Sequence, residues 1–286
     1  MNVSTPIICT TVAELREHVA QAKGQGQRVG LVPTMGALHA GHLSLANYSI
    51  QECGYTVVTI FVNPTQFAPH EDYTRYPRVL EADCQLLSTV GVNLVFAPDV
   101  AEVYPPGCNT HVEVGGVTEM LEGECRPGHF RGVATVVLKL FLMAGADVAY
   151  FGRKDYQQAA VVQQMVRDLN VPITIRTCPI VRESDGLALS SRNVYLSPDE
   201  RRQALVLSRS LQTATQLVSS GEQSADRILA AMHSVFATEP LVQFDYIALV
   251  DPVTLQPVSH LASPTIAAVA ARVGKTRLID NTLLEP

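Results

Sequence analysis

The sequence predicts an α/β protein: a parallel-sheet domain with helices on both faces, followed by a smaller C-terminal α+β domain. Apolar, β-branched runs alternate with helical patterns from residue 11 to residue 177. Residues 56–62 are apolar or β-branched throughout, as expected for a strand buried on both faces of a parallel sheet. At Ser197 a capping box with proline at the first helical position starts a different pattern. We therefore expect domains over residues 1–180 and 181–286.

The predicted elements follow one another along the chain. Val12, Leu15 and Val19 have helical spacing and predict a helix over residues 11–23, and residues 29–32 indicate a short buried strand. Further helices are expected over residues 79–89 and 133–144, and strands over 92–97, 111–114, 147–151 and 173–177. The smaller domain should contain helices over 198–218 and 225–236 and strands near 244–250, 265–271 and 276–279.

The composition is that of a folded protein without disordered tracts. Of 286 residues, 47% are hydrophobic and 17% are charged. The formal net charge of -6 argues against a nucleic-acid partner, which usually requires a basic face. The N-terminus has no basic region followed by an apolar core, and no apolar run approaches about 18 residues. We expect neither export nor membrane insertion, and a cytoplasmic location.

Six cysteines are scattered at positions 9, 53, 84, 108, 125 and 178 and form no C-x-x-C pair. This spacing predicts neither a zinc site nor a redox motif. A disulfide framework is typical of small secreted domains. Free and mostly buried thiols are expected.

Residues 33–42, Pro-Thr-Met-Gly-Ala-Leu-His-Ala-Gly-His, join a predicted strand to a predicted helix through glycines. His39 and His42 fall three apart in the first helical turn, beside unpaired N–H groups and the positive end of the helix dipole. Gly36 and Gly41 let a phosphate or a flat base approach the backbone. The segment thus favours an anion site with imidazole donors. One capping and one half-buried histidine would fit the same spacing.

Polar side chains follow three more predicted strands. Asn63 and Gln66 come after residues 56–62, Lys154 begins a predicted helix after 147–151, and Ser190 and Ser191 lie in a loop after 173–177. Amides can hold a small polar ligand, and a lysine with hydroxyls and an arginine suits a polyphosphate. Each segment also has a structural interpretation: an Asn-Pro turn, a solvated helix start and a serine turn. Residues 121–132 could form a mobile flap near an anion or an ordinary surface loop.

Two stretches imitate phosphate-binding motifs without meeting their requirements. Residues 24–30 have glycines with the wrong spacing and precede a strand instead of following one. Residues 274–276, Gly-Lys-Thr, lack the first glycine of a P-loop because position 269 is valine. We interpret the first as a loop and the second as a hairpin turn.

Several of these segments together resemble one known family. Residues 33–42, 61–67, 76–78, 126–132, 151–158 and 185–193 closely resemble, in order, the pantoate–β-alanine ligase (pantothenate synthetase) family, within the H-x-G-H nucleotidyltransferase superfamily. The match runs across most of residues 30–196, and it is specific as a set although each segment alone is weak. The C-terminal domain fits in length more than in motif.

The resemblance implies a Rossmann-like first domain that binds ATP and pantoate, a lid-like second domain, and a cytosolic homodimer. It implies an ATP-dependent condensation of (R)-pantoate with β-alanine through a pantoyl adenylate, which yields pantothenate, AMP and pyrophosphate, with Mg²⁺ accompanying ATP. By position it assigns catalytic roles to His39, His42, Lys154 and Arg192, and pantoate binding to Gln66 and Gln158. It assigns the nucleotide to Met35, Gly36, Ala37, Leu38, His39, Ala40, Gly41, His42, Gly152, Arg153, Lys154, Asp155, Val181, Leu189, Ser190, Ser191 and Arg192.

Some points stay open at the level of the sequence. Arg153 stands where the family more often has glutamate, which favours a backbone contact over a side-chain role there. No metal ligands are assigned, and Asp83 is only a weak candidate. The rival functions are a nucleotidyltransferase of the same superfamily that keeps AMP or CMP in its product, and a nucleotide-binding regulatory module without turnover.

Overall fold

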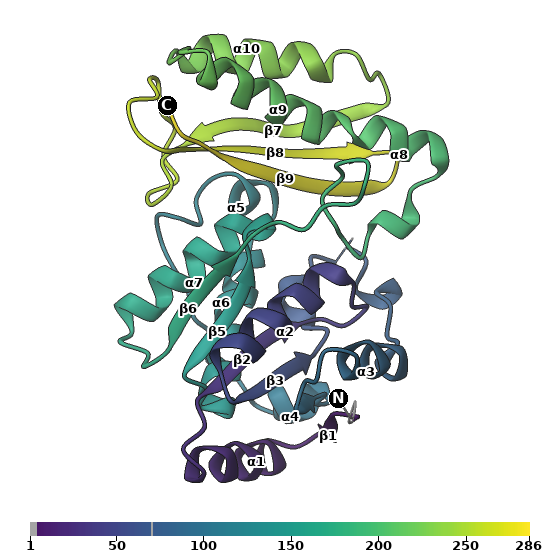
Figure 1. Ribbon diagram of the computed structural model, residues 1–286, viewed down its shortest axis with the longest axis vertical. Coiled ribbons are helices and arrows are strands. Elements are labelled where there is room, and N and C mark those ends of the chain that lie inside the picture. Colours follow the sequence, from purple (N-terminus) through teal and green to yellow (C-terminus); the bar gives the residue numbers. More distant parts are fainter. Residues whose placement is uncertain (1–4, 70) are drawn as a thin grey trace. The chain divides into compact units, whose positions relative to one another are not determined.

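The computed structural model describes residues 5–69 and 71–286, which form two compact units (Figure 1). Unit 1 comprises residues 1–153 and 158–179, and unit 2 comprises residues 154–157 and 180–286. The elements of the first stretch are β1 (Ile7–Cys9), α1 (Val12–Gly24), β2 (Val29–Thr34), α2 (Ala40–Glu52), β3 (Tyr55–Ile60), η1 (Pro64–Gln66), η2 (Tyr73–Arg75), α3 (Leu80–Ser88), β4 (Leu94–Phe96), α4 (Val100–Val103), α5 (Glu122–Cys125), α6 (His129–Ala144), β5 (Val148–Gly152), η3 (Arg153–Asp155), α7 (Tyr156–Asp168) and β6 (Thr174–Cys178). They are followed by η4 (Asn193–Tyr195), α8 (Pro198–Ala204), α9 (Val206–Ser219), α10 (Ala225–Phe236), β7 (Val242–Val250), β8 (Thr265–Val273) and β9 (Thr276–Leu284).

Unit 1 is built on a six-stranded parallel sheet with strand order β1-β4-β3-β2-β5-β6. The chain moves from β2 through β3 to β4 in one direction, and then places β5 and β6 on the other side of β2. The order therefore reverses between β2 and β5, and open α/β sheets bind ligands at the carboxyl edge of such a point. The predicted parallel α/β sheet is confirmed.

Helices cover both faces of this sheet (Figure 1). Leu31 and Val32 are consecutive in β2, so their side chains point to opposite faces, and both are fully buried. On one face, Val32 packs in a cluster with Leu45 of α2 and Leu87 of α3. Helices α1 and α6 contact each other and β2. The double cover explains the uninterrupted apolar pattern of β2 and β3.

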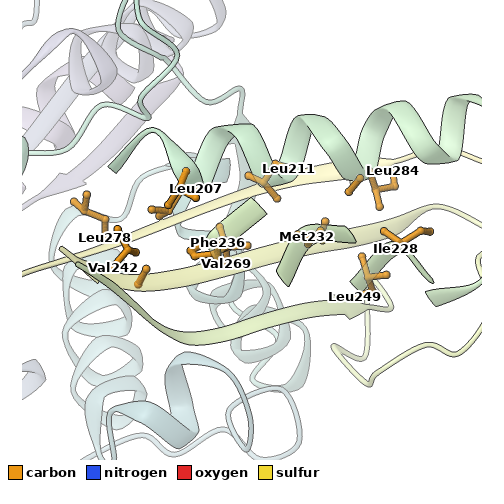
Figure 2. Close-up of a cluster of buried hydrophobic side chains, with 14 of the residues drawn as sticks. Leu207, Leu211, Ile228, Met232, Phe236, Val242, Leu249, Val269, Leu278 and Leu284 are labelled. Atoms are coloured by element: carbon orange, nitrogen blue, oxygen red, sulfur yellow. The ribbon is translucent and has the colours of Figure 1, made fainter. Parts of the chain in front are cut away.

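Unit 2 contains a three-stranded antiparallel sheet in the order β7-β8-β9. Helices α9 and α10 pack on this sheet, and Figure 2 shows the cluster between them. Leu211 of α9, Met232 of α10 and Val269 of β8 are among its buried members. The predicted capping box at Ser197 is present. The single helix predicted from residue 198 to 218 is interrupted at Leu205, which separates α8 from α9.

The structure differs from the sequence-based assignment in four further places. Strand β1 pairs in parallel with β4 at the sheet edge, and α4 also escaped prediction. The strand predicted over residues 111–114 is wrong, because the segment pairs with no strand in the described part of the chain and Val112 N–H donates to the Thr135 side chain. Helix α6 begins at His129 instead of residue 133.

The turn predicted at Gly274 joins β8 to β9, with Gly274 at φ 57°. All six cysteines are free, and four of them are buried, as predicted. Among the described residues, no helix combines the length and apolar character that a membrane crossing requires.

Candidate active site

The loop after β2 is held by hydrogen bonds to Asp83 of α3. Gly36 has φ 81°, and a Cβ at this position would lie 3.0 Å from Asp83 Oδ2 and from Ile60 Cγ2. Ala37 also has positive φ, 51°, which is uncommon for a residue with a side chain. The Asp83 carboxylate accepts from Ala37 N–H at 2.9 Å and from Leu38 N–H at 2.7 Å. These contacts hold the loop in a conformation that the local sequence alone disfavours.

Asp83, the weak metal candidate, thus uses both oxygens on backbone donors. The carboxyl is 1% exposed, and burial raises its pKa against the opposing effect of the two N–H donors. In residues 5–69 and 71–286, no group of three or more histidine, cysteine, aspartate or glutamate side chains could hold a metal ion.

The two histidines cap helix α2 with their own side chains. His39 is the N-cap residue, and its Nδ1 accepts from Gly41 N–H at 3.1 Å. His42 Nδ1 accepts from His39 N–H at 3.3 Å, which completes a reciprocal capping box. Both side chains are half-buried, with ring centroids 4.1 Å apart. The capping interpretation therefore holds for both histidines.

This capping fixes the chemistry that the imidazoles offer. A nitrogen that accepts a hydrogen bond from N–H carries no proton, so each neutral ring has its proton on Nε2. His39 and His42 therefore each present an Nε2–H donor at the start of α2, where the helix dipole is positive. Such an arrangement suits a ligand with negatively charged oxygens.

The segment after β3 holds Gln66 in one orientation. Gln66 Oε1 accepts from Asn63 Nδ2 at 3.0 Å, so its amide nitrogen faces the other way, 3.2 Å from Met35 Sδ. Asn63 is 1% exposed, and its Oδ1 accepts from Tyr104 OH at 2.9 Å. Asn63 thus fixes the amide of Gln66, and Met35 brings the loop after β2 within contact of it.

The N-terminal turn of α6 packs tightly on this segment. A Cβ at Gly132 would lie 2.3 Å from the carbonyl oxygen of Thr65, so only glycine fits. His129 Nδ1 donates to Gln66 O at 2.9 Å, and its Nε2 accepts from Arg126 Nη1 at 3.0 Å. Residues 121–132 are not an irregular loop throughout, because α5 and the start of α6 occupy most of the stretch, and His129 contacts Gln66.

Half-buried charges complete this support. Arg126 forms a two-point ion pair with Glu71, at 2.7 and 2.9 Å. Burial alone would raise the pKa of Glu71, but the hydrogen bonds and charge of Arg126 outweigh it and lower that pKa. Burial, reinforced by the Arg126 charge, lowers the pKa of His129 to about 4. His129 is therefore neutral near pH 7, as its acceptor role toward Arg126 requires.

The segment after β5 is divided between the two units. Gly152 ends β5, Arg153 starts η3, and both belong to unit 1 together with Gln158 in the first turn of α7. Lys154 and Asp155 belong to unit 2. Lys154 Nζ lies 3.3 Å from each Asp155 carboxylate oxygen.

The loop after β6 folds back on itself within unit 2. Glu183 N–H donates to Leu187 O at 2.8 Å, and Leu189 N–H donates to Val181 O at 3.0 Å, so residues 181–189 form a short hairpin. Ser190 Oγ then accepts from Arg192 N–H at 3.3 Å. Ser190, Ser191 and Arg192 therefore lie together in the turn that follows the hairpin.

The sequence-predicted residues thus fall into two groups. Within unit 1, strands β3, β2 and β5 are adjacent and parallel. The segments that follow them therefore begin at the same edge of the sheet. Unit 2 carries Lys154, Asp155, Val181 and residues 189–192. Sequence reasoning missed the supporting roles of Glu71, Arg126, His129 and Tyr104. Gly132, three residues after His129, was the available signal for a close helix contact.

Comparison with known proteins gives one consistent family. The family model described as pantoate–beta-alanine ligase matches residues 7–283. A pantothenate synthetase from Moorella thermoacetica is 54% identical over 275 residues, which cover 96% of this chain and 97% of that protein. One from Roseiflexus sp. is 53% identical over 278 residues, covering 97% and 99%.

Solved structures agree. The crystal structure of pantothenate synthetase from Thermus thermophilus matches with a TM-score of 0.94 and 48% identity, covering 98% of this chain and 100% of that one. The pantoate–β-alanine ligase from Francisella tularensis, solved with β-γ ATP and β-alanine, matches with a TM-score of 0.80 and 34% identity over 97% of each chain.

Proposed function

The chain belongs to the pantoate–β-alanine ligase family, and from this premise we propose how its residues carry the reaction. The enzyme condenses pantoate with β-alanine to form pantothenate, with ATP as co-substrate. The observation that carries the assignment of roles is the pair of Nε2–H donors at the start of α2, placed at the carboxyl edge of the central strand β2.

We propose that the first half-reaction forms pantoyl adenylate. A pantoate carboxylate oxygen attacks the α-phosphorus of ATP in line, the bond from that phosphorus to the bridging oxygen breaks, and pyrophosphate leaves. Negative charge grows on the phosphate oxygens during this step, and preorganised donors stabilise it. His39 and His42 supply two such donors, and Lys154 and Arg192 supply positive charge. The resemblance assigns all four residues to the catalytic group.

Pantoate is held by Gln66 and Gln158 in this proposal. The support for Gln66 is its fixed amide: Oε1 accepts from Asn63, whereas within residues 5–69 and 71–286 the hydrogen-bond partner of Nε2 is a thioether sulfur. Sulfur is a weak acceptor, so a substrate oxygen can replace it at little cost. Gln158 lies in the same unit, one helical turn beyond the segment after β5.

The second half-reaction releases AMP. The amine nitrogen of β-alanine attacks the acyl carbon of pantoyl adenylate, the bond from that carbon to the phosphate oxygen breaks, and the amine proton passes to solvent. The mixed anhydride would hydrolyse in water, so the site must exclude water until the amine arrives. The family resemblance assigns that task to the C-terminal domain as a lid.

Three further assignments rest on the family resemblance. We propose that Mg²⁺ accompanies ATP and neutralises phosphate charge when bound, held chiefly by the phosphates because no cluster of three protein ligands exists among the described residues. We also propose a homodimer and a cytoplasmic location. Sedimentation velocity on the purified protein measures directly whether it is a homodimer.

An ATP–pyrophosphate exchange assay tests the proposed order of steps. Exchange should require (R)-pantoate and proceed without β-alanine, and free AMP should appear only after β-alanine is added. A nucleotidyltransferase would retain the nucleotide in its product, and a regulatory module would release no pyrophosphate with any acid and amine. Exchange without pantoate, or AMP release before β-alanine, would contradict the adenylate mechanism.

A further inference from the structure

Two consecutive residues of β9, Asp280 and Asn281, hold both nucleotide-binding segments of unit 2. They are 4% and 3% exposed, and the proposed chemistry uses neither. Asn281 contacts the Lys154 turn, and Asp280 contacts the hairpin that leads to Ser190. All of these residues belong to unit 2.

The contact with the Lys154 turn is made to the backbone. Asn281 Nδ2 donates to the Lys154 carbonyl oxygen at 2.8 Å. Two residues later, Tyr156 OH donates to Pro252 O at 2.9 Å, which attaches the same turn to unit 2 at a second point. The backbone of Lys154 is therefore fixed, while its side chain extends to a partly exposed position.

The contact with the hairpin is an ion pair between the buried Asp280 carboxylate and the more exposed Arg182 guanidinium. Asp280 accepts from Arg182 Nη1 at 2.6 Å and from Nη2 at 2.9 Å, and Arg182 Nη1 also donates to Gly186 O at 3.0 Å. Arg182 pairs across the hairpin with Ala188, so the ion pair fixes both of its strands. Two-point arginine–carboxylate pairs are geometrically specific.

The charges of the two segments meet at Asp280. Burial raises the pKa of Asp280, and the Arg182 guanidinium favours its charged form, with a further contribution from the Lys154 ammonium. Asn281 N–H adds a hydrogen bond to Asp280 Oδ1 at 2.8 Å. Asp280 and Asn281 thus form one polar pair that contacts both the Lys154 turn and the hairpin of residues 181–189.

We propose that Asp280 and Asn281 are positioning residues of the ligase reaction. They tie the Lys154 turn and the Ser190–Arg192 turn to one strand, and so set the spacing between the ammonium, the hydroxyls and the guanidinium that bind the ATP phosphates. This inference rests on the proposed function, because it assumes that these two turns bind the nucleotide. Both side chains are buried, so the proposed role requires no contact with substrate.

The test uses Asn281→Ala in the full-length enzyme. A catalytic group misplaced by about 1 Å can cost roughly 10²-fold in rate, so we expect the ATP–pyrophosphate exchange rate to fall by roughly 10- to 100-fold. The KM for ATP should rise, and the KM for pantoate should stay unchanged. The matched control is Asp245→Asn, which removes the charge from the ion pairs with Arg277 and Arg272 in the same sheet but contacts neither turn.

A second measurement separates positioning from general destabilisation. Calorimetry with a non-hydrolysable ATP analogue should show weaker binding for Asn281→Ala in the native background and no further loss in a Lys154→Ala background, because Asn281 acts through Lys154. A merely structural role would weaken binding equally in both. If Asn281→Ala does not fold, Tyr156→Phe loosens the same turn and should show the same non-additivity.

The outcomes distinguish the inference from the proposed function. Native exchange and affinity in both Asn281→Ala and Tyr156→Phe, with Lys154→Ala impaired, would overturn the positioning role and leave the proposed site intact. Native exchange and affinity in Lys154→Ala would overturn the proposed site itself. Additive losses of affinity in the double variants would likewise overturn the positioning role.

Discussion

At the scale of the residue, His39 and His42 show how a capping interaction can prepare a functional group. Each Nδ1 accepts a backbone N–H in the first turn of α2, which prevents the rings from rotating and assigns their protons to Nε2. The donors are therefore oriented before any substrate binds. Preorganisation of this kind costs no rearrangement at the moment of reaction.

His42→Ala should lower the rate of pantoyl adenylate formation by roughly 10²–10³, the scale of losing one preorganised donor. It should also destabilise the fold by about 0.5–2 kcal/mol, because His39 N–H loses its capping acceptor. Single-turnover formation of adenylate measures the first effect, and urea denaturation measures the second. The exposed His260 provides the control variant, His260→Ala. An unchanged single-turnover rate would exclude a role for His42 in this step.

At the scale of the element, the contact between α6 and η1 determines where Gln66 lies. Gly132→Ala would place a methyl group 2.3 Å from Thr65 O, so the helix must move away. Overpacking typically costs about 1–3 kcal/mol. We expect lower stability and a higher KM for pantoate at an unchanged KM for ATP, measured by denaturation and by exchange kinetics. Gly115→Ala, where a Cβ meets nothing within 4 Å, is the control and should change neither quantity.

The same element makes stability depend on pH. The folded-state pKa of His129 is about 4, against 6.5 for the free group, so between these values the unfolded chain binds a proton that the folded protein excludes. The contribution is fully present above pH 6.5 and is lost as the pH falls toward 4. Its size is on the order of 3 kcal/mol.

Urea denaturation at pH 7 and pH 4.5 measures this effect against His129→Asn, which keeps a neutral N–H donor. We expect the variant to be less stable at pH 7 but to lose less stability on acidification than the native protein. The paired carboxylate of Glu71 titrates in both proteins, so the difference between them isolates His129. Parallel losses would show that His129 does not carry the effect.

The elements also show what the sequence could and could not predict. Residues 56–62 and 225–236 were predicted because their patterns are local: a continuous apolar run and a 3.6-residue period. The strand β1 was missed because it has three residues at a sheet edge, and Ile7 and Ile8 are about half exposed. Residues 111–114 alternate as a strand does, but pairing needs a partner that the local pattern cannot reveal.

The candidate site likewise has a part that the sequence predicted and a part that it did not. The strand-end segments were found from glycines and polar residues close together in the chain. Their supports were not, because each lies far away in sequence: Asp83 is 46 residues from Ala37, and Asn281 is 127 residues from Lys154. Such contacts depend on the packing of the whole domain. The roles of the site residues in catalysis are still predictions.

At the scale of the whole molecule, the protein should fold without a metal and need one only for chemistry. Among the described residues no group of three or more histidine, cysteine, aspartate or glutamate side chains could hold a metal ion, so we expect chelation to remove no structural cross-link. We expect excess EDTA to leave the unfolding temperature unchanged and to suppress ATP–pyrophosphate exchange, with activity restored by added Mg²⁺. Calorimetric unfolding and exchange assays measure the two effects. A lower unfolding temperature in EDTA would reveal a structural ion.

The path of the chain between the two units limits how this enzyme can be divided or recombined. Residues 154–157 are an insert of unit 2 inside the sequence of unit 1, so a gene fragment that begins at residue 180 would lack a piece of its own fold. The buried Asn281 amide would lose the carbonyl that it contacts, at a cost of about 1–3 kcal/mol. A chimera that exchanges C-terminal domains between relatives would therefore have to transfer this tetrapeptide too. Otherwise Asn281 and the Lys154 carbonyl that it contacts would come from different proteins.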